Sequence, residues 1–293
     1  MSDIIYHYTS LETLNAILNN VENDELTLRA THVNYLNDNT ENEIAVNILK
    51  KNLLEYESQL GNISNKKIFN NLDDDKIDFF KNISFDKLPP FIFSLSKEKD
   101  SLPMWNTYAD KSLGICIGFN KNNIEEYAEK SANTRLIECD YNHNRVEVFI
   151  KKNIQQLYNS ITISNYFIGV IQGGDKSIWH EFEKMVPLLK DSNYNYEKEW
   201  RVVIEPKFDW DSTTNFKDLS FNVVDGLPKP YIDFKVKKDF IKEIVVGPCS
   251  NFNLVSKSLA MMLSKIGCKS SINNDFANEH ILISSSNCPF RQI

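Results

Sequence analysis

The chain has 293 residues, of which 42% are hydrophobic, and its formal net charge is −7. This length and apolar content are sufficient for a sizeable core, while the acidic balance argues against a broad surface that neutralises nucleic-acid phosphates. The sequence contains no apolar run of the roughly 20 residues that span a bilayer, and its first residues lack the pattern of a signal peptide. We therefore expect a cytoplasmic protein that does not associate with membranes.

The five cysteines and five histidines are scattered along the chain, and no two cysteines have CxxC spacing. A disulfide framework or a zinc site usually shows closely spaced ligands of these types. The sequence therefore predicts neither a disulfide framework nor a metal site.

Hydrophobic periodicity predicts the following elements in the first half of the chain. Strands are expected at 4–9, at the start of 25–38, and at 91–97, 114–120 and 135–141. Helices are expected at 10–20, 40–60 and 101–110. Thr9 and Glu12 have the spacing of a capping box for the first helix.

The second half continues with both types of element. Helices are expected within 146–172 and 176–190 and at 254–267, and strands within 197–206 and 231–248 and at 280–286. No repeat or Pro/Gly-rich linker divides these elements, so we predict a single α+β domain over residues 1–293 with a mixed or antiparallel sheet. Two helical insertions are expected, at about 40–88 and 146–190.

The segment YNYEKEWRVV, residues 194–203, places charged side chains within a predicted strand. Strand alternation would put Glu197, Glu199 and Arg201 on one face. Trp200 would then be buried on the other face, and Arg201 would lie within reach of Glu197 or Glu199. A solvated edge strand with paired charges is the structural alternative.

Two further groups place polar residues on predicted strands. His7, Tyr8 and Thr9 lie at the end of the first strand, and Ser94 and Ser96 share one face of a middle strand. Each group also has a structural interpretation, as a core histidine or as serines at a strand end.

The order of these groups resembles that of the ADP-ribosyltransferase fold, which has a split β-sheet core and cleaves NAD between nicotinamide and ribose. That fold carries a His or Arg on its first strand, an S-x-S strand and a late E-x-E strand. The opening HYTSLETLNAIL is similar to the start of several bacterial members. His7 resembles the His-Tyr-Glu subclass. The pairs Ser94-Ser96 and Glu197-Glu199 resemble the Arg-Ser-Glu subclass, so the subclass stays open.

The resemblance implies catalytic roles for two residues. A carboxylate at Glu199 would stabilise the oxocarbenium character that develops on the ribose and would hold its 2′-hydroxyl. Glu197 would orient the acceptor nucleophile. Ser94 and Ser96 would support Glu199 and the nicotinamide ribose.

The same resemblance implies further residues that contact NAD, the substrate. His7 would bind the adenosine ribose, with Tyr8 and Thr9 beside it. Trp105 and Tyr108 lie at helical spacing that is typical of core residues, but their rings also suit a planar nicotinamide. Two arginines are candidates for the pyrophosphate, Arg29 and Arg201, and Arg201 is alternatively a partner of Glu197 or Glu199.

A second resemblance extends over nearly the whole chain. The segments HYTS, LND, FSLS, MWNTYAD, GICIGF, YEKEWR, VVGP and SSSNCPFR are similar, in this order, to the pattern of a large bacterial family of unknown function. The family supplies no activity, but it implies that these polar positions belong to one architecture.

We therefore expect an NAD-dependent ADP-ribosyltransferase that modifies a protein, RNA or DNA acceptor, as a bacterial toxin or an anti-phage effector with an antitoxin or immunity partner. One alternative is a metal-dependent nuclease, in which Asp38, Glu41, Glu197 and Glu199 would bind Mg²⁺. Another is a non-catalytic interaction module, in which the E-x-E-W-R strand is a ladder of ion pairs.

Overall fold

The computed structural model describes residues 3–36, 41–60, 90–163, 176–206, 219–224, 226–273 and 280–289. The chain divides into two compact units. The first comprises Met1–Tyr35, Pro90–Glu138 and Tyr196–Ile293, and the second comprises Leu36–Pro89 and Cys139–Asn195. Both segments that the sequence predicts as helical insertions fall within the second unit.

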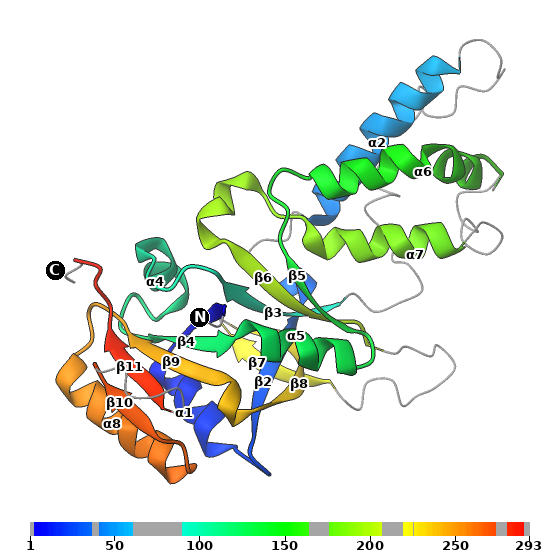
Figure 1. Cartoon of the computed structure of the whole chain (residues 1–293). Helices are drawn as coiled ribbons and strands as arrows, with labels where there is room; N and C mark the ends of the chain where they lie inside the picture. The colour runs from blue at the N-terminus through cyan, green and yellow to red at the C-terminus, as the bar shows by residue number, and fades with distance from the viewer. Residues whose placement is uncertain are drawn as a thin grey trace. The chain divides into compact units, whose positions relative to one another are not determined.

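In the described part of the chain, the first unit contains one large sheet and four α-helices (Figure 1). Its strands are β1 (Ile4–Thr9), β2 (Glu25–His32), β3 (Phe91–Ser96), β4 (Ile115–Asn120), β5 (Thr134–Glu138), β6 (Glu199–Ile204), β7 (Ser220–Val224), β8 (Leu227–Lys237), β9 (Ile241–Val246), β10 (Ser270–Ile272) and β11 (Ile281–Ser285). Its helices are α1 (Leu11–Asn19), α4 (Leu102–Tyr108), α5 (Lys121–Lys130) and α8 (Phe252–Lys265), with short 3₁₀ turns at Val33–Tyr35 and Lys238–Phe240.

The sheet is mixed, which confirms the predicted α+β class. Its main path runs β10-β11-β9-β4-β1-β3-β2-β8-β7, and β6 and β5 continue from β3. Strand β11 is parallel to both β10 and β9. All other pairings between the described strands are antiparallel.

Strand β3 is the junction of the sheet because three strands pair with it. Strand β6 pairs with every residue of β3 and so occupies one whole edge. On the other edge, β1 pairs at Ser96 and β2 pairs at Phe91 and Ile92. The sheet therefore splits at β3 into a β1 branch and a β2 branch.

Two hydrophobic clusters cover opposite faces of this sheet. The larger one joins strand residues such as Ile5 and Phe93 to Leu14 of α1, Ile124 of α5 and Leu259 of α8. We call this side the helix face. The smaller cluster contains Tyr6, Tyr8, Cys116 and Val245 together with Met104, Trp105 and Ala109 from α4 and its C-terminal cap. We call this second side the α4 face.

The second unit is helical. It contains α2 (Glu41–Gln59), α6 (Asn144–Ile163), α7 (Lys176–Met185) and a 3₁₀ turn at Val186–Leu188 (Figure 1). Its core includes Leu49 and Leu53 from α2, Ile150 from α6 and Trp179 from α7. This unit therefore has an apolar core of its own.

Most predicted elements are confirmed within a few residues, but two details differ. Ser10, and not Thr9, caps α1, because its side chain accepts a hydrogen bond from the Thr13 amide at 3.0 Å. The sequence interpretation missed α5, β7 and β10. Predictions for residues 61–88 and 164–172 fall outside the described residues. None of the described helices is long and apolar enough to cross a lipid bilayer.

We expect Gly114→Ala to lower the free energy of unfolding by about 1–3 kcal/mol, which is typical of overpacking. A Cβ atom at Gly114 would lie 2.3 Å from the Thr9 carbonyl oxygen and 2.9 Å from the Ala109 carbonyl oxygen, so the backbone would have to shift. Chemical denaturation measures the change, with Ser258→Ala on the exposed side of α8 as the control. Equal stability of Gly114→Ala and wild type would contradict the packing described for this turn.

Candidate functional site

Strand register brings residues from five strands into one row on the α4 face. Tyr6 lies opposite Ser96, and Ser96 lies opposite Glu199. In the other direction, Tyr6 lies opposite Gly118, and Gly118 lies opposite Glu243. The row therefore consists of Glu199, Ser96, Tyr6, Gly118 and Glu243. Its two carboxylates are far apart in sequence and lie at its two ends.

A buried ion pair forms one end of this row. Arg201 Nη2 donates to Glu199 Oε2 at 3.0 Å, and the two side chains are 1% and 4% exposed. Because both follow strand alternation on β6, they share the α4 face with Ser94, the cross-strand partner of Arg201. The expectation that Arg201 lies within reach of Glu199 is confirmed. Removing one member of such a pair typically costs about 3–5 kcal/mol, since the other charge stays buried.

Glu197 reaches this site by a different route from the one predicted. It ends a 3₁₀ turn at Ser192–Glu197, and Lys198 has a φ of 44°, so β6 begins only at Glu199. The prediction that Glu197 belongs to the strand is therefore wrong. The Glu197 side chain is nonetheless buried, and Tyr108 Oη donates to its Oε1 at 2.7 Å.

Ser96 and Tyr8 fix the loop that joins β3 to α4. The Ser96 hydroxyl donates to the Glu197 carbonyl at 2.5 Å and accepts from the Glu98 amide at 2.9 Å. Tyr8 Oη donates to the Glu98 carbonyl at 2.7 Å and accepts from the Ser101 amide at 3.1 Å. Both hydroxyls thus hold backbone in place.

Asp100, which the sequence analysis did not select, ties the same loop to the C-terminal segment. Its carboxylate accepts from Trp105 Nε1, Ser286 Oγ and the Asn287 amide, each at 2.6 Å. Burial alone would raise the pKa of Asp100, but the hydrogen bonds from Ser286, Trp105 and Asn287 outweigh it and lower this pKa. In the sequence, the segment DSLPMW places Asp100 five residues before Trp105. This spacing was the available signal that the two side chains interact.

The far end of the row holds a second group that the sequence analysis missed. Tyr6 Oη donates to Glu243 Oε1 at 2.7 Å, and Lys99 forms an ion pair with Glu243 Oε2. Burial, followed by the hydrogen bond to Glu243, raises the pKa of Tyr6. A Cβ atom at Gly118 would lie 2.7 Å from Glu243 Cγ, so glycine provides the space for this carboxylate.

The resemblance implies that His7 and Glu199 contact the same NAD molecule, but the two side chains lie on opposite faces of the sheet. His7 and Thr9 alternate with Tyr6 and Tyr8 along β1 and therefore point to the helix face. The His7 ring stacks on Phe93 with centroids 4.4 Å apart, and its Nδ1 lies 2.9 Å from the Ser94 carbonyl. Burial lowers the pKa of His7, against the effect of this hydrogen bond.

The remaining predicted residues have clear local environments. Trp105 is fully buried in the α4-face cluster, edge-on to Tyr8, which fits its interpretation as a core residue. Tyr108 is half-buried. Arg29 is about half exposed on β2, where it pairs with Asp233 at 3.7 Å and stacks on Tyr231.

Trp200 points to the helix face, as alternation predicts, but it is half-buried and not fully buried. Lys97 and Lys121 lie over its ring at 5.8 and 4.4 Å from the centroid.

The described residues offer little for a metal-dependent nuclease. Among them, no three His, Cys, Asp or Glu side chains are grouped so as to hold a metal ion. Asp38 lies outside the described residues, and Glu41 belongs to α2 of the second unit. We therefore find no observation that favours this alternative.

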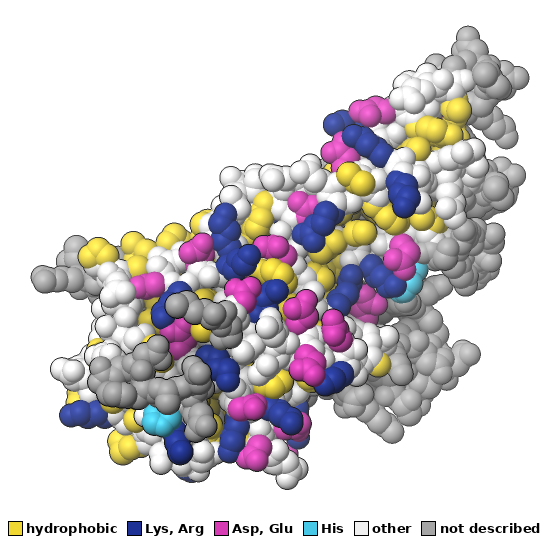
Figure 2. Space-filling view, in the orientation of Figure 1, with side chains coloured by type: hydrophobic (Ala, Val, Ile, Leu, Met, Phe, Trp, Pro, Cys, Tyr) yellow, Lys and Arg dark blue, Asp and Glu magenta, His cyan; other side chains and the backbone are white. Residues whose placement is uncertain are grey.

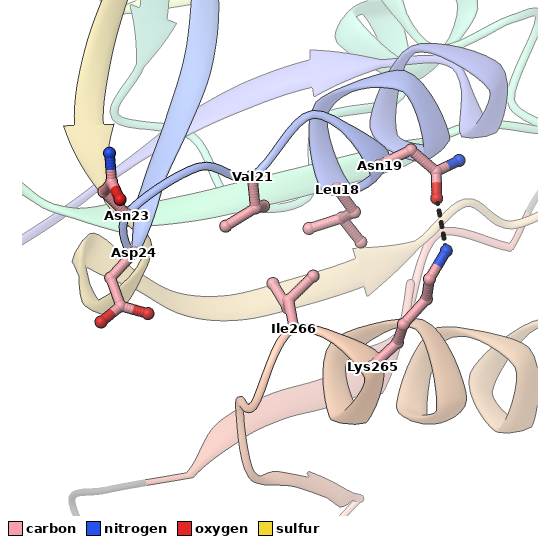
Figure 3. Close-up of a pocket in the computed structure, with 7 residues that line it drawn as sticks. All are labelled: Leu18, Asn19, Val21, Asn23, Asp24, Lys265 and Ile266. Carbon is pink, nitrogen blue, oxygen red and sulfur yellow. Dashed lines mark hydrogen bonds between the residues drawn. The ribbon is translucent and has the colours of Figure 1, made fainter.

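A cavity of about 420 Å³ lies elsewhere in the first unit, between the ends of α1 and α8. Figure 3 shows Leu18, Val21 and Ile266 between the polar side chains that line it, with Lys265 donating to Asn19 Oδ1. Both helices cover the helix face, so this cavity is separate from the row on the α4 face.

Comparison with known families gives one match. Residues 104–202 match a family described as "Protein of unknown function (DUF2971)". The matched segment begins in α4 and ends in β6, so it includes Tyr108, Glu197, Glu199 and Arg201. Comparisons with curated proteins and with solved structures yield no match.

We expect Asp100→Asn to lower the free energy of unfolding at pH 7 by about 2 kcal/mol, because hydrogen bonds to a charged group are lost or weakened. A lowered folded-state pKa stabilises the fold above the ordinary value of 3.8, and this contribution disappears as the pH falls through the folded-state value. Denaturation at pH 7 and pH 3 should therefore show a difference that narrows on acidification. The exposed Asp239→Asn is the control, and a difference independent of pH would refute this role.

Proposed function

We propose that this chain is an NAD-dependent ADP-ribosyltransferase that modifies a macromolecular acceptor. The observation that carries the proposal is the grouping of two buried carboxylates, Glu197 and Glu199, with Tyr108, Arg201 and the S-x-S strand on one sheet face. Loss of nicotinamide creates positive charge on the ribose, which a fixed carboxylate stabilises. The split of the sheet at β3 also agrees with the fold that the sequence resembles.

Glu199 is the proposed catalytic carboxylate. Its ion pair with Arg201 fixes one oxygen of a carboxylate that is 4% exposed. Arg201 acts as a positioning residue in this proposal, because its guanidinium is fully buried and already engaged with Glu199. The pyrophosphate would be bound elsewhere.

Glu197 is proposed to orient the acceptor nucleophile. The hydrogen bond from Tyr108 holds its carboxylate, and the hydroxyl of Ser96 holds its backbone. These two contacts set the position of Glu197 relative to β6, where Glu199 begins the strand. Such support restricts a catalytic group to a narrow range of geometries.

The proposed contacts to NAD are revised by the register of the sheet. Ser94, half-buried on the α4 face, supplies a hydroxyl, and the ring of Tyr108 offers an aromatic surface. These groups fit a ribose and a nicotinamide chemically. His7 and Thr9 are left out of this set because they lie on the helix face, and Trp105 is left out because its ring packs against Tyr8 and its Nε1 donates to Asp100.

The acceptor is proposed to be a protein or a nucleic acid, in a toxin or an anti-phage effector that an antitoxin or immunity partner would restrain. Lys and Arg side chains are interspersed with Asp and Glu on the face that Figure 2 shows. This mixture and the net charge of −7 favour a protein acceptor. Incubation with labelled NAD and total cell extract tests the proposal, since label should enter either protein or RNA and DNA.

We expect Glu199→Gln to reduce transfer about 100-fold to 1000-fold, the typical loss when one electrostatic stabiliser of a transition state is removed. Gln keeps the shape and still accepts a hydrogen bond from Arg201, but it lacks the negative charge that faces the ribose. Transfer of labelled ADP-ribose is measured beside a thermal melt, because the variant also weakens a buried ion pair. A folded Glu199→Gln protein with wild-type transfer would refute the catalytic role.

Tyr108→Phe tests the proposed role of Glu197 and leaves both members of the Glu199–Arg201 ion pair in place. It removes the hydroxyl that positions Glu197, so we expect transfer to acceptor to fall more than hydrolysis of NAD. Tyr127→Phe on the helix face is the matched control and should change neither activity. Equal loss of both activities in Tyr108→Phe would contradict the role of Glu197 in orienting the acceptor.

A further inference from the structure

The hairpin of β7 and β8 exposes an unusual concentration of apolar side chains. Among the described residues, ten large hydrophobic side chains are exposed, and four of them lie between positions 221 and 227. Phe221 is 62% exposed, Val223 is 68% exposed and Leu227 is 48% exposed. Clustered apolar exposure of this kind marks surfaces that contact another molecule.

The prolines of β8 show which way the backbone of β7 points. Phe221 pairs with Pro230, and Val223 pairs with Pro228. Proline has no N–H to exchange, so these are the non-hydrogen-bonded pairs of the antiparallel ladder. The N–H and C=O groups of Phe221 and Val223 must therefore point away from β8, toward the outer edge of β7.

In the part of the sheet that the structure describes, this outer edge is the last one. Among the described strands, β7 pairs with β8 alone. Residues 220–224, SFNVV, contain neither a charged residue nor a proline, the devices that usually protect an edge strand from pairing. Strand β8 differs in this respect. At Pro228 and Pro230 it has no N–H groups to donate on the side that faces away from β7.

We propose that β7 pairs with β7 of a second copy of this chain, antiparallel about a two-fold axis at Asn222. In this register, Phe221 of each copy lies opposite Val223 of the other. Their outward N–H and C=O groups then form hydrogen-bonded pairs, and an aromatic side chain meets a β-branched one on the same face.

A second copy suits this edge better than a charged partner does. The chain carries a net charge of −7, so two copies repel each other in general, but the edge itself is uncharged and brings no like charges into contact. The strand has only five residues, and small interfaces belong to weak complexes. The dimer is therefore expected to form reversibly as the protein concentration rises.

Sedimentation of the full chain over a range of concentrations tests this pairing. The average mass of the wild type should shift from one copy toward two, and Val223→Lys should abolish the shift because it places like charges close to each other across the axis. Met261→Lys, at an equally exposed apolar position on α8 (67%), is the matched control and should dimerise as the wild type does. A wild type that stays monomeric, or a Val223→Lys variant that still dimerises, would overturn the proposal.

A cysteine at the axis tests the register independently of affinity. The two copies of residue 222 form a non-hydrogen-bonded pair with Cα atoms about 4.5 Å apart, within the range that a disulfide spans. Under mild oxidation, Asn222→Cys should form covalent dimers well above the wild-type background from the native free cysteines. Met261→Cys should not exceed that background. Equal crosslinking of the two variants would exclude this register.

Discussion

Strand β3 pairs with three other strands, and those pairings decide which strand residues of the candidate site lie side by side. Because β6 runs along one whole edge, Ser94 and Ser96 share a face with Arg201 and Glu199. Because β1 pairs on the opposite edge, Tyr6 joins the same row while His7 turns away from it. One strand thus decides which polar side chains meet, although they come from distant parts of the sequence.

The α4 face combines this row with a small apolar cluster, and the combination constrains its electrostatics. Each buried carboxylate of the row has a basic partner, Arg201 for Glu199 and Lys99 for Glu243. Four strand spacings separate the two carboxylates, a span of roughly 19 Å. Each ion pair therefore offsets the burial of its own carboxylate, which alone would carry a large desolvation cost.

The sequence predicted the α+β class and most elements because their apolar periodicities are strong. It also predicted the face shared by Glu199 and Arg201, since alternation within one strand is a local property. It could not place His7, because the pairing of β1 with β3 joins segments about ninety residues apart and is not encoded locally.

Glu197 was misplaced for a different reason. The positive φ of Lys198 interrupts the strand without a glycine or proline to signal it. Asp100 was missed because its partners, Ser286 and Asn287, are distant in the sequence. Strand β7 was missed because its alternation is weak, and the start of β8 was missed because two prolines interrupt it.

The long sequence separation of the Asp100 contacts also bears on the order of events during synthesis. Ser286 and Asn287 follow Asp100 by 186 and 187 positions. At 5–20 residues per second, a ribosome needs roughly 10–40 s to add that length of chain. For this interval the loop after β3 lacks the hydrogen bonds that Ser286 and Asn287 later donate, so the newly made chain completes its α4 face only after these two residues have been synthesised.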